Sequence, residues 1–248
     1  MNPFGADWDG PAFALFGFTH LAMLGLIVLL NFWLARDKGK PEASRLRTRR
    51  ILASILLVNE LAYHAWVFST GRWTLATMLP LHLCAVLVWM TVWSLPRPGQ
   101  TSYEIAWFAG LAGASQALMT PDLSLYGFGH FRFFQTFISH GILVTAPIYL
   151  TVVEGMRPRR MSVWRVLGYL SAYAVVVFWV NRALGSNYLF INRKPDTASL
   201  LDLLPAWPGY LVVLVGIAVL VFSLLSVPFW VEGLRRSVPG ASRASADR

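Results

Sequence analysis

The chain has 248 residues, of which 56% are hydrophobic and only 13% charged, and its mean hydropathy is +0.54. This composition excludes an ordinary soluble domain, in which about a quarter of the residues are charged. The formal net charge of +9 could indicate nucleic-acid binding, but the basic residues are confined to particular loops between apolar segments. That placement favours contact with anionic lipid headgroups instead.

Seven apolar segments approach the roughly 20 residues that a helix needs to cross a hydrocarbon core about 30 Å thick. In chain order they are residues 11–34, 51–69, 74–94, 104–119, 133–153, 163–184 and 209–231. Backbone groups in lipid must be hydrogen-bonded within the chain, and these long segments lack the alternation of barrel strands. The sequence therefore predicts an all-α polytopic membrane protein. We expect a seven-transmembrane-helix bundle in a single domain over residues 1–236, followed by a disordered cytoplasmic tail over residues 237–248.

The loops between the segments differ strongly in their Lys and Arg content. Seven lie in residues 36–50, one at Arg97, four in residues 157–165 and four after residue 231, which makes sixteen of the 21 on one side. By the positive-inside rule, the N-terminus is predicted outside and the C-terminus in the cytoplasm, which requires an odd number of spans. No basic region precedes the first apolar run, so a cleaved signal peptide is not expected. We predict a multi-pass protein of the plasma (inner) membrane.

Polar and titratable side chains gather near the predicted outer side. They include all five histidines, the only cysteine and one intramembrane acid: His20, His64, His82, His130, His140, Cys84 and Glu60. With a rise of about 1.5 Å per residue, several of them lie at roughly the same depth, on the order of 8–14 Å below the outer surface. Such residues are costly in lipid, so their shared depth predicts a functional site.

Glu60 and His64 are four residues apart and therefore lie on one helix face, where they can interact directly. A structural hydrogen bond that orders the bundle and a proton-relay or orienting role are both open. Near the outer span ends, three amides are candidate donors to a developing oxyanion: Gln116, Gln135 and Asn181.

Pro80 is predicted to kink the third span, because proline removes a helical hydrogen bond. His82 and Cys84 follow it two residues apart, so on a continuous helix they point about 200° apart and only one can face the site. A lone buried cysteine is either an apolar filler or a nucleophile. His140 precedes Gly141 in mid-span, where an imidazole needs a partner and the glycine permits close approach of a helix or ligand.

The connection between the sixth and seventh spans is the longest loop, and long ordered loops are often lids or binding loops. Its Arg193 and Lys194 are candidates for binding a phosphate headgroup, but an interfacial cap without a ligand is equally open. Three further headgroup candidates are Arg132, Arg182 and Asn187. No histidine pair has i,i+4 spacing and no HExxH motif is present, so neither a metal nor a cofactor is expected.

Several stretches resemble the YwaF family of bacterial integral membrane proteins. They are LPLHLC (79–84), QALMTPD (116–122), HFRFFQTFISHG (130–141), NRALGSNYLFINRKPDTASLLD (181–202) and Trp207-Pro208. More distantly, the chain is similar to the eukaryotic transmembrane protein 164 family. That resemblance implies acyl transfer between phospholipids by a cysteine and a histidine on separate spans. By position, His140 matches the histidine and residues 80–84 match the cysteine-bearing helix. In the eukaryotic motif the cysteine directly follows the proline and precedes a histidine, which corresponds to Leu81 and His82 here and not to Cys84.

The predicted function is therefore that of a membrane-embedded phospholipid acyltransferase or lipid hydrolase, with Cys84, His140 and His82 as its catalytic residues. Its expected partner is a membrane phospholipid or lysophospholipid. Nucleic acid is not expected, and a homo-oligomer is compatible with the sequence. Two alternatives are open. One is a small-molecule or proton-coupled transporter or receptor with an outer polar vestibule, and the other is a noncatalytic membrane scaffold.

Overall fold

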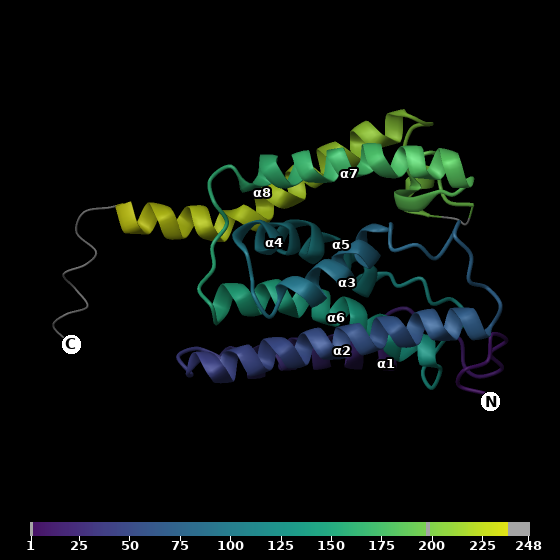
Figure 1. Ribbon diagram of the computed structural model, residues 1–248, viewed down its shortest axis with the longest axis horizontal. Helices are drawn as coiled ribbons and strands as arrows, with labels where there is room; N and C mark the ends of the chain where they lie inside the picture. The colour runs from purple at the N-terminus through teal and green to yellow at the C-terminus, as the bar shows by residue number, and fades with distance from the viewer. Residues whose placement is uncertain (1, 197–198, 238–248) are drawn as a thin grey trace.

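The computed structural model describes residues 2–196 and 199–237, and all regular secondary structure within these ranges is helical. The helices lie side by side along the long axis of the molecule (Figure 1). The all-α fold class is therefore confirmed. The α-helices are α1 (Phe18–Leu34), α2 (Glu42–Ser69), α3 (Leu83–Ser94), α4 (Gln100–Ile105), α5 (Leu111–Met119), α6 (Phe131–Val152), α7 (Ser162–Leu184) and α8 (Gly209–Ser237).

Five helices in the described ranges are long and apolar enough to cross a membrane. They are Phe18–Asp37, Glu42–Ser69, Phe131–Val152, Ser162–Leu184 and Gly209–Gly233. Helix α3 is apolar but has only 12 residues. The fourth predicted span consists of α4, the π-helical segment η2 (Ala106–Gly110) and α5 in direct succession. Seven crossings and the orientation of the termini thus remain predictions, and we refer below to a predicted outer end and a predicted cytoplasmic end.

The third span was predicted to be helical over residues 74–94, and this prediction is wrong for residues 74–82. Residues 70–82 form turns and extended backbone, and α3 begins only at Leu83. His82 is the N-cap of α3, with φ −67° and ψ 149°, and Pro80 precedes the helix instead of kinking it. Because proline disfavours a helical conformation of the residue before it, the helix starts after the proline. The predicted 200° separation of His82 and Cys84 on one helix is therefore also wrong.

The other predicted boundaries differ less. The first helix begins at Phe18 and not at residue 11, and α2 begins at Glu42, nine residues before the predicted start. Helices α6 and α7 agree with prediction to within two residues at each end. Ser237 still belongs to α8, and the remainder of the predicted tail, residues 238–248, lies outside the described residues.

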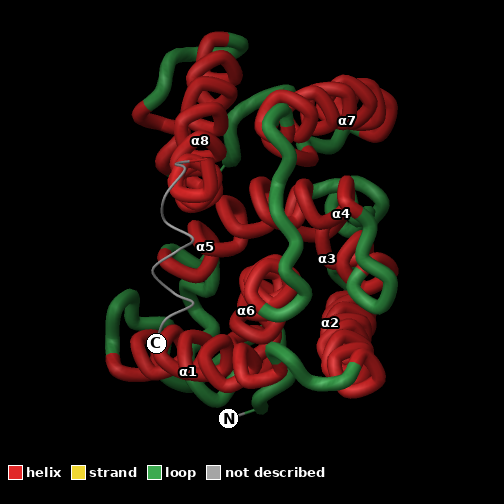
Figure 2. The backbone as a smooth tube through the Cα atoms, turned by 90° about the vertical axis from the view of Figure 1, so that its left-hand side faces the viewer, coloured by secondary structure: helices red, strands yellow, loops and turns green. Residues whose placement is uncertain are grey.

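Helix α6 occupies the centre of the bundle and contacts α1, α2, α3 and α5 (Figure 2). In its most apolar stretch 72% of the residues are buried, against 17% for α1, α7 and α8. The shared core includes Leu56, Phe108, Leu143 and Val166. Helices α7 and α8 form a separate layer that contacts the rest mainly through α4 and η2. Since α6 touches most other helices, its polar residues can meet side chains from several of them.

Candidate functional site

Hydrogen bonds divide the five histidines into two groups. In a neutral ring, a nitrogen that faces a carbonyl oxygen carries the hydrogen, whereas a nitrogen that faces an N–H is bare. His20 accepts from Phe16 N at Nδ1 (2.9 Å), and its Nε2 donates to Leu118 O (2.8 Å). His130 accepts from Arg132 N at Nδ1 (3.1 Å) and donates to Gly5 O from Nε2 (2.9 Å). Both rings are fully satisfied, so their role is structural.

His64 also has both ring nitrogens occupied. Its Nδ1 accepts from the indole Nε1 of Trp73 at 3.2 Å, and its Nε2 lies 3.4 Å from Oε1 of Glu60. The contact predicted from the i,i+4 spacing is therefore present. The guanidinium of Arg132 lies 4.4 Å from the centre of the ring of Tyr63, the residue before His64. This polar cluster joins the outer end of α2 to the start of α6.

His140 and His82 differ from the other three, because one ring nitrogen of each has no hydrogen-bond partner among the described residues. Nδ1 of His140 lies 2.9 Å from Thr136 O, so this nitrogen donates and Nε2 is left as a bare acceptor. Nδ1 of His82 accepts from Leu189 N at 3.4 Å, so its Nε2 carries the hydrogen. Neutral His140 can thus accept a proton at Nε2, whereas neutral His82 can donate a hydrogen bond from Nε2.

The position of His140 follows from the pattern of polar residues along α6. Polar side chains recur every three or four residues, which places them on one face of the helix. They are Arg132, Gln135, Thr136, Ser139 and His140. The adjacent Gly141 faces α1, where an added Cβ would lie 3.1 Å from two side-chain atoms of Ile27. The expected close approach at this glycine is confirmed, and its neighbour is a helix.

Cys84 is a free, half-buried thiol in the first turn of α3. A Cβ added at Gly113 of α5 would lie 3.8 Å from its Sγ. Gly110, three residues before Gly113, packs against α6: a Cβ there would lie 3.7 Å from Leu143 O. Helices α5 and α6 run antiparallel. One turn from this contact towards the predicted outer end therefore leads to Gly113 on α5 and to His140 on α6. Cys84 and His140 therefore lie at about the same level, although no hydrogen bond joins them.

The three candidate oxyanion donors are placed differently. Asn181 is buried, and both hydrogens of its amide are used, by Tyr188 O at 2.9 Å and Asn192 Oδ1 at 2.7 Å. Gln116 is exposed and donates to Thr120 Oγ1 at 2.9 Å. Gln135 is buried beside Arg132, which donates to its side-chain oxygen. Of the three, Asn181 serves to fix the loop after α7.

Two of the predicted headgroup residues hold the same loop together. Lys194 Nζ donates to Leu204 O at 2.8 Å, and Asn187 Nδ2 donates to Arg193 O at 2.9 Å. Arg193 is exposed and lies 3.8 Å from the carboxylate of Asp196, and Arg182 is exposed as well. Sequence reasoning missed the structural role of Tyr188, which is fully buried beneath this loop and contacts the His82 ring.

A metal site is not apparent in the ranges that the structure describes, because no three His, Cys, Asp or Glu side chains in them are grouped to hold an ion. The arrangement instead offers one thiol, one proton acceptor and one hydrogen-bond donor towards the predicted outer end.

These features define a multi-pass helical membrane protein with a histidine-rich polar site. The chain belongs to the TMEM164 family, whose model matches residues 13–226 and so includes Cys84, His82 and His140. Neither the comparison with curated proteins nor that with solved structures gave a match. The predicted resemblance to the transmembrane protein 164 family is therefore confirmed. Assignment to the bacterial YwaF family and to the plasma membrane in particular remain predictions.

Proposed function

We propose that the protein is a membrane-embedded phospholipid acyltransferase in which Cys84 is the nucleophile and His140 the general base. Family membership supports this class of function, because the resemblance to the eukaryotic family implies acyl transfer. The motif cysteine of that family corresponds to Leu81, so the choice of Cys84 is based on its level beside His140 and not on the family. The observation that carries the proposal is the bond from His140 Nδ1 to Thr136 O, because it directs a bare Nε2 away from the helix backbone. A general base needs this tautomer.

The proposed transfer begins when His140 Nε2 removes the proton of the Cys84 thiol, and the thiolate attacks the ester carbonyl carbon of a phospholipid. The carbonyl oxygen takes up the electron pair and accepts a hydrogen bond from the Nε2–H of His82. When this intermediate collapses, the bond between the carbonyl carbon and the glycerol oxygen breaks. The leaving oxygen takes the proton from His140, which yields a lysophospholipid and a thioester on Cys84.

In the second half, the hydroxyl of another lysophospholipid attacks the thioester carbonyl while His140 accepts its proton. The carbon–sulfur bond then breaks and the proton returns to sulfur, so both the enzyme and the ester bond are restored. If water takes the place of the lysophospholipid, the same residues release a fatty acid, which is the hydrolase form of the proposal. Contacts between nucleophile and base often tighten only when substrate binds, so the proposal requires Cys84 and His140 to approach each other in the complex.

The test uses the purified full-length chain in vesicles that contain a phospholipid with a labelled acyl chain and an unlabelled lysophospholipid acceptor. We expect Cys84→Ala and His140→Gln to lower the transfer rate by roughly 10²- to 10⁴-fold. We expect His82→Gln to lower kcat by about 10²- to 10³-fold. His64→Gln is the matched control, because the ring of His64 is already occupied by Trp73 and Glu60, and it should retain most of the activity.

Full transfer by Cys84→Ala would contradict the thioester route. Absence of both transfer and hydrolysis in the wild type, combined with pH-dependent solute uptake by the same vesicles, would favour the transporter alternative. Thermal unfolding of each variant in detergent separates a lost reaction from a lost fold.

A further inference from the structure

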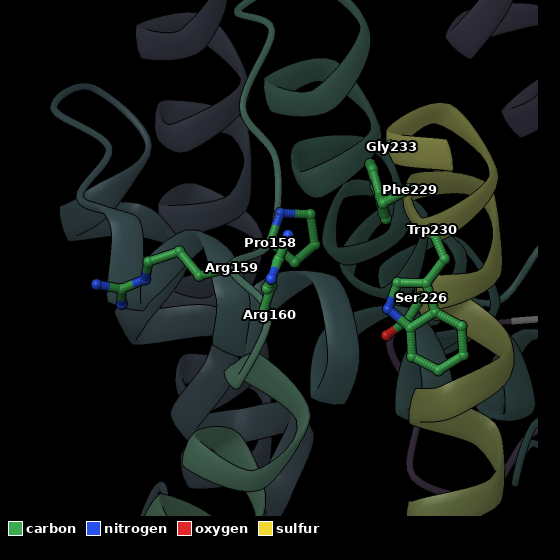
Figure 3. Close-up of a pocket in the computed structure, with 7 residues that line it drawn as sticks. All are labelled: Pro158, Arg159, Arg160, Ser226, Phe229, Trp230 and Gly233. Carbon is green, nitrogen blue, oxygen red and sulfur yellow. The ribbon is translucent and has the colours of Figure 1, made fainter. Parts of the chain in front are cut away.

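Two cavities of about 420 Å³ each lie at the predicted cytoplasmic end, opposite Cys84 and His140. One lies along a single face of α2, beside Arg47 and Arg50. The other lies between the loop that joins α6 to α7 and the final turns of α8 (Figure 3). We call the second one the α8 cavity. Residues from two separate chain segments line it, whereas the first cavity lies on the surface of one helix.

The walls of the α8 cavity are fixed by side chains from both segments. Arg157 Nε donates to Glu232 Oε2 at 2.9 Å, which ties the loop to α8, and its guanidinium lies 5.6 Å from the centre of the Phe229 ring. Trp107 Nε1 of η2 donates to Leu225 O at 3.2 Å and holds the same part of α8. The cavity is therefore formed before any ligand binds, which lowers the entropic cost of binding.

The arginines of the loop differ in their partners. Arg157 is paired with Glu232, and Arg159 donates from Nε to Glu104 Oε1 at 2.9 Å. Figure 3 shows Arg159 directed away from α8, in agreement with this pairing. Arg160 lines the cavity and is exposed, and the part of the chain that the structure describes gives it no acidic partner. Its positive charge is thus available to an anion from outside the protein.

The opposite wall is apolar and aromatic. Phe229 and Trp230 line the cavity together with Ser226, and 53% of the surface of Trp230 is exposed. Tryptophan is enriched at the depth of lipid headgroups, where its amphipathic ring meets both hydrocarbon and water. An arginine and an aromatic wall that line one cavity suit a ligand with a phosphate at one end and hydrocarbon at the other.

We propose that the α8 cavity binds the phosphate headgroup of an anionic phospholipid, with Arg160 on the phosphate and with Phe229 and Trp230 against the glycerol and the first acyl carbons. A cavity of about 420 Å³ falls within the range of small-molecule sites. This lipid is separate from the proposed acyl donor, since the two sites lie at opposite ends of the bundle. A soluble organic phosphate shares the phosphate chemistry but lacks the apolar part, so the experiment distinguishes the two sources.

The test is native mass spectrometry of the purified full-length chain in detergent, titrated with phosphatidylglycerol, phosphatidylcholine or glycerol 3-phosphate. We expect the wild type to retain phosphatidylglycerol at lower concentration than phosphatidylcholine. Arg160→Gln should weaken phosphatidylglycerol binding by about fivefold. Arg97→Gln is the matched control, because Arg97 is an exposed arginine at the same predicted end, outside the α8 cavity, and it should bind as the wild type does.

Three results would overturn the proposal. If Arg160→Gln and Arg97→Gln weakened phosphatidylglycerol binding equally, the lipid would be held by the general positive charge of the surface and not by the α8 cavity. Equal retention of phosphatidylglycerol and phosphatidylcholine by the wild type would show no preference for an anion. Binding of glycerol 3-phosphate as tight as that of phosphatidylglycerol, with no effect of Trp230→Ala on either, would identify a site for soluble phosphates and not for lipid.

Discussion

The backbone N–H of Leu79 donates a 2.9 Å hydrogen bond to the hydroxyl of Tyr188, which in turn donates to Leu75 O at 2.7 Å. A single buried side chain after α7 thus satisfies two backbone groups of the irregular segment before α3. Tyr173 of α7 adds a third bond, from its hydroxyl to Leu81 O at 2.9 Å. Irregular backbone at membrane depth needs such partners in the protein. The position of His82 therefore depends on tyrosines that lie about a hundred residues away.

We predict that Tyr188→Phe destabilises the protein by about 1–3 kcal/mol, because the Leu79 N–H and the Leu75 carbonyl lose their partner. The free energy of unfolding in detergent measures this loss. Tyr169→Phe is the control, since Tyr169 is 48% exposed and should change stability little. Equal stability of the two variants would show that water replaces the Tyr188 hydroxyl.

The same contacts explain which parts of the fold could be predicted from the sequence. Helices α6 and α7 were predicted to within two residues at each end, because their apolar runs end in polar or glycine-containing loops. The segment before α3 is just as apolar, so hydropathy extended the third span back to residue 74. The actual start at Leu83 follows from Pro80 together with hydrogen bonds from α7 and the loop after it, and a local pattern does not contain such distant partners.

His130, which precedes α6, provides a prediction about pH. Burial lowers the pKa of His130, the nearby charge of Arg132 lowers it further, and its bond to Gly5 O opposes them only in part. The folded state then binds a proton less readily than the unfolded state, whose histidine pKa is about 6.5. His130 therefore contributes its full share to the free energy of unfolding above about pH 6.5, and this contribution is lost as the pH falls towards and through the lower pKa of the folded state.

The measurement is the unfolding free energy of the wild type and of His130→Gln between pH 7.5 and pH 5. We expect the wild type to lose more stability on acidification than the variant does, and the difference isolates His130 from the other histidines. Identical slopes for the two proteins would show that His130 does not contribute to the pH dependence.

The surroundings of Cys84 can be tested through its reactivity. Gly113→Leu would place a side chain against the thiol, since even a Cβ there lies 3.8 Å from Sγ and 3.5 Å from Leu83 Cδ2. We expect slower alkylation of Cys84 by a maleimide, together with a loss of about 1–3 kcal/mol of stability from overpacking. Gly168→Leu in α7 is the control, because a Cβ at Gly168 meets nothing within 4 Å. Equal alkylation rates in both variants would place the thiol away from Gly113.

The candidate site was predictable where it depends on local spacing and unpredictable where it depends on distant backbone. The contact between Glu60 and His64 could be predicted because the two residues are four positions apart on one helix and so lie on the same face. The distinction between structural and available histidines does not, because the groups that occupy His20 and His130 are Leu118 O and Gly5 O, which are far away in sequence. The tautomer of His82 likewise depends on a distant group, Leu189 N, whereas that of His140 is set within α6 by Thr136 O, four residues earlier.

The contact between α1 and α6 gives a prediction that can be checked with a compensating change. A Cβ at Gly141 would lie 3.1 Å from two Ile27 atoms, so Gly141→Leu should push α1 away and cost about 1–3 kcal/mol. Ile27→Ala alone opens a space on the same contact and should also destabilise. In the double variant the leucine fills that space, so the combined loss should be smaller than the sum of the two single losses. Unfolding free energies of all four proteins in detergent measure this coupling. Strict additivity would mean that the two side chains do not meet, and α1 would then have to pack on α6 through other residues.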